Sequence, residues 1–571
     1  MLKKLPLSSC ILFVAFCAYA FFFYQSLGNR LLNPEWTTDD AMQQTFVLHD
    51  VYNPDIFKDD IIYKVMKGYL TPVHYWISYA ATWVTDSPIM GGHIVMLIQL
   101  GLTILFLFLA IKAATKSWGP AFFAVAWLLH TRTLIERMTG GLPRGWAAVV
   151  FAAFLYGVLS KRHGLTSIFL VLGCLVHPPA TFLCAVAYGI WLLFSFFSKQ
   201  TRRDGIIGLK FVIPTAIICA VLAWKVVQRP PEIGQMVDFE TASKMPAFQN
   251  PGGRFPFIPQ PSIWEHFNDF TYNAFINKWF EPLPLIKEYG WIVIYGTLLA
   301  FLILGLRQKR TIVPLSLWSF LLAVASVYLA SRQVMFKLYV PDRHLLFPMT
   351  FFMIAAFTVG TWNLATTPTR EKTWRGLVSL IILAGVIFLS SGSGFTGDAQ
   401  FRYHIHRKGR AFDWVKKYTP RFALIAGHPT HVDPVPLFGM RRAFVTSEVA
   451  HPFYPKYYSE MERRLAVALK AHYATSFNEF LKLVTAEKID YFIFSRQRFY
   501  PNNLRNESYY KPLDTLTKRL TSRGPDAYAY KMLPRKVDPQ YPFVKFVDDQ
   551  STIIDIKELE IFLVRNPQFG E

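Results

Sequence analysis

One of the most acidic stretches of the chain lies between two apolar segments near the amino terminus. It contains the adjacent pair Asp39-Asp40, then His49-Asp50, and it ends at Asp60. Carboxylates beside apolar segments are costly unless water, a cation or a chemical task holds them there. We predict that Asp39 acts as a general base on a hydroxyl group. The alternative is a solvated loop or a helix cap, for which Asp is common.

Further charged side chains stand at the ends of apolar segments. Glu136 is flanked by Arg137 and Arg144, so it is either a second acid of the site or half of an ion pair. Arg343 precedes a late apolar segment, where its forked guanidinium would suit a phosphate. The alternative for Arg343 is an interfacial anchor whose head reaches the water.

Histidines complete the candidate set. We predict that His74, His177 and His344 bind substrate together with the arginines. His49 and Asp50 offer the nitrogen and oxygen ligands of a divalent cation such as Mg or Mn, although no fixed ligand spacing supports it. No other cofactor is predicted, and histidines that are simply hydrogen bonded are the alternative.

The composition shows which kind of chain positions these residues. Of 571 residues, 52% are hydrophobic and 17% are charged, against about 25% charged in ordinary soluble domains. The net charge of +22 comes largely from short basic blocks between apolar runs, which is typical of membrane orientation and not of nucleic-acid binding. All five cysteines lie in apolar segments, which argues against a disulfide framework.

The apolar runs predict an α-helical polytopic membrane protein with about eleven spans. Basic residues follow every second run, so the positive-inside rule places the amino terminus inside and the carboxyl terminus outside. A cleaved signal peptide is the alternative for the first run. The predicted spans are roughly 8–27, 91–111, 118–130, 146–160, 165–176, 180–197, 206–227, 291–306, 312–330, 344–360 and 377–390.

Two domains follow from the change in composition near residue 395. Residues 1–395 form the membrane domain, with outer loops at about 28–90 and 228–290, and 396–571 form a soluble α/β domain. In that domain we predict strands at 422–426, 443–446, 491–494 and 561–564, and helices at 458–473 and 477–486. Gly427-His428-Pro429 follows a strand, where it either reads a sugar or makes a turn.

This layout resembles the GT-C superfamily of integral-membrane glycosyltransferases, in which a first outer loop carries an acid pair like Thr38-Asp39-Asp40. The resemblance implies that Asp39 is the catalytic base and that Glu136 is a second acid. It also implies that Arg343 holds the carrier phosphate. His344 stands where the family usually has Tyr, and Asp40 where it often has Glu.

The resemblance predicts an inverting transfer of a sugar from a polyprenyl-phosphate carrier to a hydroxyl of a glycan, lipid or protein. Asp39, Asp40 and Glu136 would form the catalytic group, on the outer face of a bacterial inner membrane rather than of the endoplasmic reticulum. Cell-envelope glycan synthesis is the implied process, without a nucleic-acid partner. The alternatives are a transporter or flippase of a lipid-linked or small solute, and a non-catalytic scaffold of the same layout.

Overall fold

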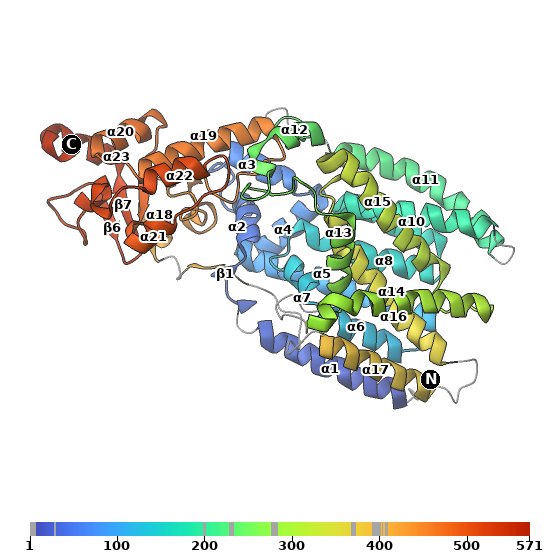
Figure 1. The fold of residues 1–571 in the computed structure, drawn as a ribbon. Coiled ribbons are helices and arrows are strands. Elements are labelled where there is room, and N and C mark those ends of the chain that lie inside the picture. The colour runs from blue at the N-terminus through green and yellow to red at the C-terminus, as the bar shows by residue number, and fades with distance from the viewer. Residues whose placement is uncertain are drawn as a thin grey trace.

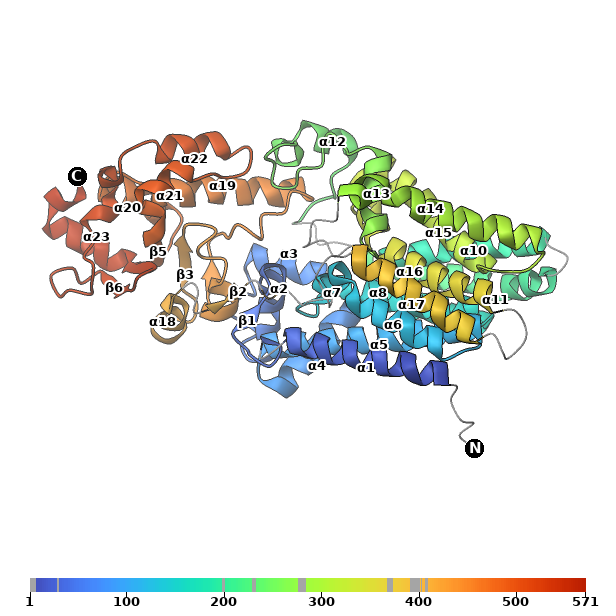
Figure 2. The same cartoon turned by 60° about the horizontal axis from the view of Figure 1, so that its bottom comes forward.

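The structure is a computed structural model of the 571-residue chain. It describes residues 7–27, 30–197, 201–227, 233–275, 284–366, 373–390, 401, 403–405 and 409–571. A helical body occupies one end of the molecule and the carboxyl-terminal sheet and helices occupy the other (Figure 1). Figure 2 shows the segment that follows the first helix between these two parts.

Apolar helices build the body. Within the described residues, six helices are long and apolar enough to cross a membrane: α5 (Pro88–Thr115), α10 (Pro178–Phe197), α11 (Arg202–Val227), α14 (Pro284–Arg307), α15 (Leu315–Val334) and α16 (Arg343–Ala365). Five further apolar helices are α1 (Leu7–Leu27), α6 (Gly119–His130), α8 (Trp146–Leu159), α9 (His163–Val176) and α17 (Thr373–Ser390). Each predicted span coincides with one of these helices. The polytopic helical class is therefore confirmed, and the number of crossings stays a prediction.

Helix α16 runs through the centre of the body. Its apolar window is 94% buried, whereas that of α11 is 11% buried. It packs between α6, α15, α17 and α13 (Ile263–Tyr272), and Phe351 and Phe352 are fully buried there. A helix that is apolar on every side is stable only inside protein or lipid. The central packing of α16 therefore fixes the position of Arg343 at its first turn.

The loop predicted to lie outside at about 28–90, called the first outer loop below, is a folded unit. It contains α2 (Asp39–Thr45), η2 (Phe46–Val51), α3 (Ile61–Tyr69) and α4 (Pro72–Thr85). Thr38 caps α2, because its Oγ1 accepts the Ala41 N–H at 3.1 Å. The aspartate pair therefore occupies the first turn of α2, where the helix dipole favours carboxylates.

Short elements connect the longer helices. The long outer loop predicted at 228–290 holds a small apolar core with Phe248, Phe257 and Phe336, although residues 228–232 and 276–283 lie outside the described part. The connecting elements are α7 (Arg132–Met138), η3 (Pro143–Gly145), α12 (Phe239–Lys244), η4 (Pro246–Phe248) and η5 (Met335–Leu338).

The carboxyl-terminal part is an α/β unit whose mixed five-stranded sheet has the strand order β4-β3-β5-β7-β6. Strands β3, β4 and β5 are parallel, and β7 runs antiparallel to β5 and β6. The strands are β3 (Leu424–Gly427), β4 (Arg442–Ala443), β5 (Tyr491–Ser495), β6 (Val544–Val547) and β7 (Ser551–Asp555). The helices are α18 (Ala411–Tyr418), α19 (Pro455–His472), α20 (Phe477–Ala486), α21 (Pro501–Asn506), α22 (Asp514–Thr521) and α23 (Ile556–Arg565), with short turns η8 (Val435–Gly439), η9 (Arg496–Phe499), η10 (Pro525–Ala527), η11 (Ala529–Met532) and η12 (Pro567–Gly570).

The strand predicted at 561–564 is wrong, because these residues belong to α23. Leu559 and Leu563 are buried four residues apart, whereas Ile561 and Val564 are 46% and 78% exposed. This pattern of burial has a helical period, which the unbroken apolar run 561–564 does not show in the sequence. Asp555 caps the helix by accepting the Glu558 N–H at 3.1 Å. The missed strands β6 and β7 complete the sheet.

The first outer loop and the carboxyl-terminal part share one hydrophobic core. Phe46 and Phe57 from the loop are buried with Phe444 and Tyr454. His49 Nε2 also lies 2.7 Å from the Leu437 carbonyl oxygen, and a two-stranded ladder pairs β1 (Trp36–Thr37) with β2 (Tyr403–His404). The predicted boundary at 395/396 lies outside the described residues, so the division at that point stays a prediction.

Candidate functional site

A glycine pair lets the segment between α7 and η3 approach the amino terminus of α2. Gly140 and Gly141 have φ angles of +85° and +65°, which side chains rarely adopt. A Cβ on Gly140 would lie 2.5 Å from the Ala41 Cβ, and one on Gly141 would lie 2.1 Å from the Gly92 oxygen. Only glycine fits this double contact, which brings Arg144 within reach of Asp40.

Asp40 is held in a positive environment. Arg144 Nη1 donates to Asp40 Oδ2 at 2.5 Å, and Gln43 Nε2 donates to Asp40 Oδ1 at 3.3 Å. Burial alone would raise the pKa of Asp40, but Arg144, with Arg137 and Arg343 further away, brings this pKa below its usual value. Asp40 is therefore an ionised and engaged carboxylate, which suits it to hold the arginines in place.

Asp39 is engaged differently. Its Oδ1 accepts the backbone N–H of Asp40 at 2.9 Å. Its Oδ2 has no hydrogen-bond partner in the part of the chain that the structure describes, and the side chain is partly exposed. Of the two adjacent acids, Asp39 therefore keeps an oxygen with which it can accept a proton from a hydroxyl group.

Three arginines from two distant segments, Arg137 and Arg144 from one and Arg343 from the other, converge beside this pair. Arg144 Nε donates to the Arg137 carbonyl oxygen at 3.0 Å, and Arg343 Nε lies 3.8 Å from Asp342 Oδ1. The buried Arg137 Nε has no hydrogen-bond partner among the described residues. Burial and the neighbouring Arg343 and Arg144 lower the pKa of Arg137 to about 10. This group has spare cationic hydrogen-bonding capacity, which suits a phosphate.

Glu136 lies near the same arginines, because it precedes Arg137 in the chain and its charge raises the pKa of that arginine. The Glu136 side chain is partly buried in α7 and is engaged within the protein. The structure thus brings Asp39, Asp40 and Glu136 to one region. Whether Glu136 serves as a second acid or as an ion-pair partner stays open.

His177 and His344 gather around Tyr339, beside Arg343. The Tyr339 ring lies 6.1 Å from the His177 ring and 6.3 Å from the His344 ring. His344 Nε2 lies 2.7 Å from the Leu338 oxygen, and His177 Nδ1 accepts the Ala180 N–H at 3.2 Å. Met335, the first residue of η5, and Tyr339, directly after it, have positive φ angles of 46° and 77°, a strain that tends to cluster at functional sites.

The carboxyl-terminal part contributes Glu448, which the sequence analysis missed and which pairs with Arg254 of the 228–290 loop. Arg254 Nη2 lies 3.1 Å from Glu448 Oε2 and also donates to the Glu448 carbonyl oxygen at 3.2 Å. Burial, followed by the charges of Asp39 and Asp40, raises the pKa of Glu448 in spite of Arg254. Glu448 therefore lies close enough to the aspartate pair for their charges to act on one another.

His451 lies near the same group, and no motif marked it or Glu448 in the sequence. Burial, together with Arg254, lowers the pKa of His451 to about 4. Arg254 follows the Gly252-Gly253 pair, a stretch whose sequence fits either a mobile acceptor loop or a turn. The signal that was available is the polar run Thr446-Ser447-Glu448 directly after a strand.

The remaining candidates have contacts inside the protein. His49 bonds to Leu437, and Asp50 Oδ2 accepts from Lys67 Nζ at 2.9 Å, from Tyr75 OH at 3.2 Å and from Tyr63 OH. His74 Nδ1 accepts the Trp146 Nε1–H at 3.0 Å, and its Nε2 lies 3.4 Å from Ser78 Oγ. These contacts join elements of the fold, and the substrate role of His74 stays a prediction.

The described residues do not assemble a metal site around the aspartate pair. No group of three or more His, Cys, Asp and Glu side chains in the described ranges could hold a metal ion. A divalent cation at Asp40 would also have to replace the guanidinium of Arg144. The Mg or Mn ion predicted at His49 and Asp50 therefore has no built site here, and no chemical step below uses one.

No protein-family model matches the chain, and no curated protein matches it in sequence. Solved structures do match. The Archaeoglobus fulgidus oligosaccharyltransferase tethered with an acceptor peptide is 10% identical, with a TM-score of 0.49 over 91% of this chain and 72% of that chain. ArnT from Cupriavidus metallidurans bound to undecaprenyl phosphate is 12% identical, with a TM-score of 0.46 over 96% of this chain and 97% of that chain.

The archaeal oligosaccharyltransferase AglB in complex with an inhibitory peptide and a dolichol-phosphate matches at 10% identity, with a TM-score of 0.47 over 86% of this chain and 69% of that chain. The same archaeal enzyme has also been solved in complex with Zn and sulfate. None of these matches assigns a role to a residue of this chain.

Proposed function

We propose that this chain is an inverting GT-C glycosyltransferase, which moves a sugar from a polyprenyl-phosphate carrier to an acceptor hydroxyl. The observation that carries the proposal is the oxygen of Asp39 that has no described partner, beside Asp40 and the converging arginines. A base and a cationic group side by side are what this displacement needs from the protein.

Asp39 acts on the acceptor. The acceptor hydroxyl transfers its proton to Asp39 as its oxygen forms a bond to the anomeric carbon of the donor. The bond between that carbon and the phosphate oxygen breaks, and its electron pair stays on the phosphate. A single displacement of this kind inverts the anomeric centre. Asp40 and Glu136 hold the surrounding cationic side chains in position.

The arginines act on the leaving group. A lipid phosphate is a weak base, so it leaves without a general acid. Arg343 and Arg137 stabilise the negative charge that develops on it, because hydrogen bonds from ionised donors are short and strong. His177 and His344, close to Arg343 through Tyr339, would contact the same end of the donor.

The proposed reaction takes place on the outer face of a bacterial inner membrane. The basic blocks between spans support an amino terminus in the cytoplasm and a carboxyl-terminal part outside. The partners would be a lipid-linked sugar donor and a glycan, lipid or protein acceptor. The sequence charge pattern and the hydrophobic core that the first loop shares with the carboxyl-terminal part both favour one shared outer site.

Asp39→Asn tests the proposal, because Asn keeps the size of the side chain but cannot accept the proton. With a panel of undecaprenyl-phosphate sugars, transfer should fall by about 10²–10⁴-fold, while undecaprenyl phosphate still binds. Asp40→Asn should have a milder effect. Full transfer by both variants would contradict the proposed base.

Two further results would point to the alternatives. Loss of transfer in Asp40→Asn with near-normal transfer in Asp39→Asn would exchange the two roles and leave the reaction class intact. Movement of the lipid-linked sugar across the membrane without any transfer, unchanged in Asp39→Asn, would favour a flippase. A protein that binds no lipid phosphate and transfers nothing would favour a scaffold.

A further inference from the structure

Strands β3 and β5 are parallel neighbours, and the chain leaves their carboxyl ends in opposite directions. From β3 it runs through His428 and η8 to β4 on one side of the sheet. From β5 it runs through η9 towards β7 and β6 on the other side. In open α/β sheets, ligands bind in the crevice that forms at such a switch point.

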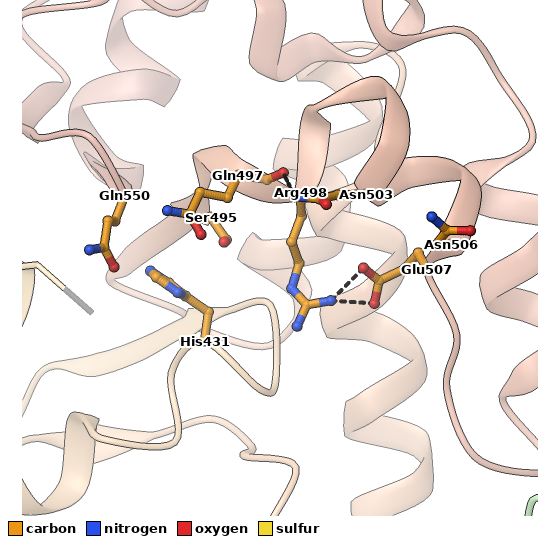
Figure 3. A pocket seen from close by; sticks show the side chains of 8 residues that line it. All are labelled: His431, Ser495, Gln497, Arg498, Asn503, Asn506, Glu507 and Gln550. Atoms are coloured by element: carbon orange, nitrogen blue, oxygen red, sulfur yellow. Dashed lines mark hydrogen bonds and ion pairs between the residues drawn. The ribbon is translucent and has the colours of Figure 1, made fainter. Parts of the chain in front are cut away.

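A cavity of about 350 Å³ lies at this place. Its volume falls in the range of about 300–1,000 Å³ that is usual for small-molecule sites. Figure 3 shows side chains from three segments around one space, with His431 opposite Ser495, and Gln550 and Arg498 at its two sides. The lining residues are His431, Ser495, Gln497, Arg498, Asn503, Asn506, Glu507 and Gln550.

The lining is polar and carries no net charge. Arg498 Nη1 donates to both carboxylate oxygens of Glu507, so its positive charge is balanced inside the cavity wall. The Glu507 side chain is only 5% exposed. Five of the eight lining residues are neutral amides or hydroxyls. An anion would find no unbalanced cation here, and an apolar ligand would leave these groups without partners.

Backbone contacts hold this lining in place. Asn503 Nδ2 donates to the Gln497 carbonyl oxygen at 2.6 Å, and the Arg496 N–H donates to the Gln550 carbonyl oxygen at 2.9 Å. His431 Nε2 lies 2.8 Å from Ser551 Oγ. The side-chain amides of Gln497 and Gln550 have no hydrogen-bond partner among the described residues, so they remain available to a ligand.

We propose that this crevice binds an uncharged saccharide. Each sugar hydroxyl both donates and accepts hydrogen bonds, and a primary amide offers two donors beside two acceptor positions. The balanced Arg498–Glu507 pair adds further donors and acceptors. An amide-rich cavity of this volume with a balanced ion pair in its wall matches that chemistry.

If the chain has the proposed function, the bound saccharide is part of the acceptor. Tyr509 follows Glu507 closely in the chain, and its hydroxyl donates to Ser447 Oγ at 3.0 Å. Element η8, which follows His431 in the chain, packs against α2, the helix that carries Asp39 in its first turn. The wall of the crevice thus continues towards the aspartate pair, and a glycan held in the crevice would extend towards the base.

Saturation-transfer NMR on the full-length protein in lipid nanodiscs tests the proposal, because a maltoside detergent would itself supply sugar. The probes are the methyl glycosides of glucose, galactose, mannose and N-acetylglucosamine, with inorganic phosphate as a competitor. The double variant Gln497→Ala/Gln550→Ala removes two side-chain amides that make no hydrogen bond within the described part of the chain. Gln540→Ala, an exposed glutamine of the same part of the chain, is the matched control.

At least one glycoside should receive saturation from the wild-type protein, from Gln540→Ala and from Asp39→Asn. Its affinity should fall by roughly tenfold or more in the double variant, since two neutral hydrogen bonds are lost, and phosphate should not displace it. Saturation of no glycoside, equal binding by the double variant, or displacement by phosphate would overturn the proposal. A loss confined to Asp39→Asn would place the sugar at the aspartate pair and would also overturn it. Because this readout needs no transfer, it fails or succeeds independently of the proposed reaction.

Discussion

Removing one arginine at a time should separate the cations that hold phosphate from those that hold Asp40. Arg144 is already engaged, because it donates to Asp40 Oδ2 at 2.5 Å. Arg343 is 3.8 Å from its nearest carboxylate, and Arg137 Nε has no described partner. The charge available to a donor phosphate therefore comes mainly from Arg137 and Arg343.

The expected magnitude follows from the kind of contact. A hydrogen bond to a charged group contributes about 1.5–3 kcal/mol, and each 1.4 kcal/mol is about a tenfold change in affinity. Arg343→Ala and Arg137→Ala should each raise the Kd for undecaprenyl phosphate by about 10–150-fold. Arg343→Lys should recover only part of this loss, because Lys keeps the charge and loses the planar fork.

Titration of undecaprenyl phosphate into protein in nanodiscs, followed by tryptophan fluorescence, measures this Kd directly. The matched control is Arg307→Ala, an exposed arginine in the last turn of α14. Unchanged affinity in both Arg343→Ala and Arg137→Ala would refute the phosphate assignment and make Arg343 an interfacial anchor. An equal loss in Arg307→Ala would show that general surface charge, and not this group, holds the lipid.

Further outcomes test the orientation, the acid stretch and the junction. Protease added to right-side-out vesicles should cut within 398–571, and protection of that region would contradict the predicted topology. Burial raises the pKa of Asp60 to about 6, so the folded state binds this proton more tightly than the unfolded chain does. The Tm should therefore fall as pH rises from about 4 to about 6. Asp60→Asn, which keeps the α3 cap, should reduce that fall, and the same dependence of Tm on pH in the variant and the wild type would exclude Asp60 as the cause of the fall. In fluorescence-detected unfolding, Arg254→Ala should lower the Tm more than Glu448→Gln, because Arg254→Ala leaves the largely buried carboxylate of Glu448 without its partner. A larger loss of Tm in Glu448→Gln would contradict the ion-pair interpretation.

Apolar runs and basic blocks were sufficient to predict the helical body. A run of about 15–20 apolar residues can be satisfied only by a helix in lipid, so each predicted span coincides with a helix. The strand predicted at 561–564 failed for a local reason. Its four apolar residues fit either period, and the cap at Asp555 and the burial of Leu559 determine that α23 forms.

The candidate site could be predicted only in part. Asp39, Asp40 and Arg343 lie near the ends of apolar runs, so the sequence could predict that they lie on the same side of the helical body. His49 and His74 also stand there, but a carbonyl oxygen and a Trp N–H engage them. Glu448 reaches the aspartate pair because two distant parts of the chain pack together, and no local pattern reports such packing.

The shared core has a consequence for the order in which the protein is made. His49 and its partner Leu437 are 388 residues apart, so at about 5–20 residues per second the ribosome needs roughly 20–80 s to supply the second after the first. During that interval Phe46, Phe57 and Met66 have none of their carboxyl-terminal partners. On the predicted topology, the first loop would wait outside the membrane, sheltered by lipid or a chaperone, until the last third of the chain has been translocated. Maturation of the protein would thus be post-translational, and a nonsense mutation before residue 437 should leave a membrane-inserted product that quality-control proteases recognise by this unpaired loop.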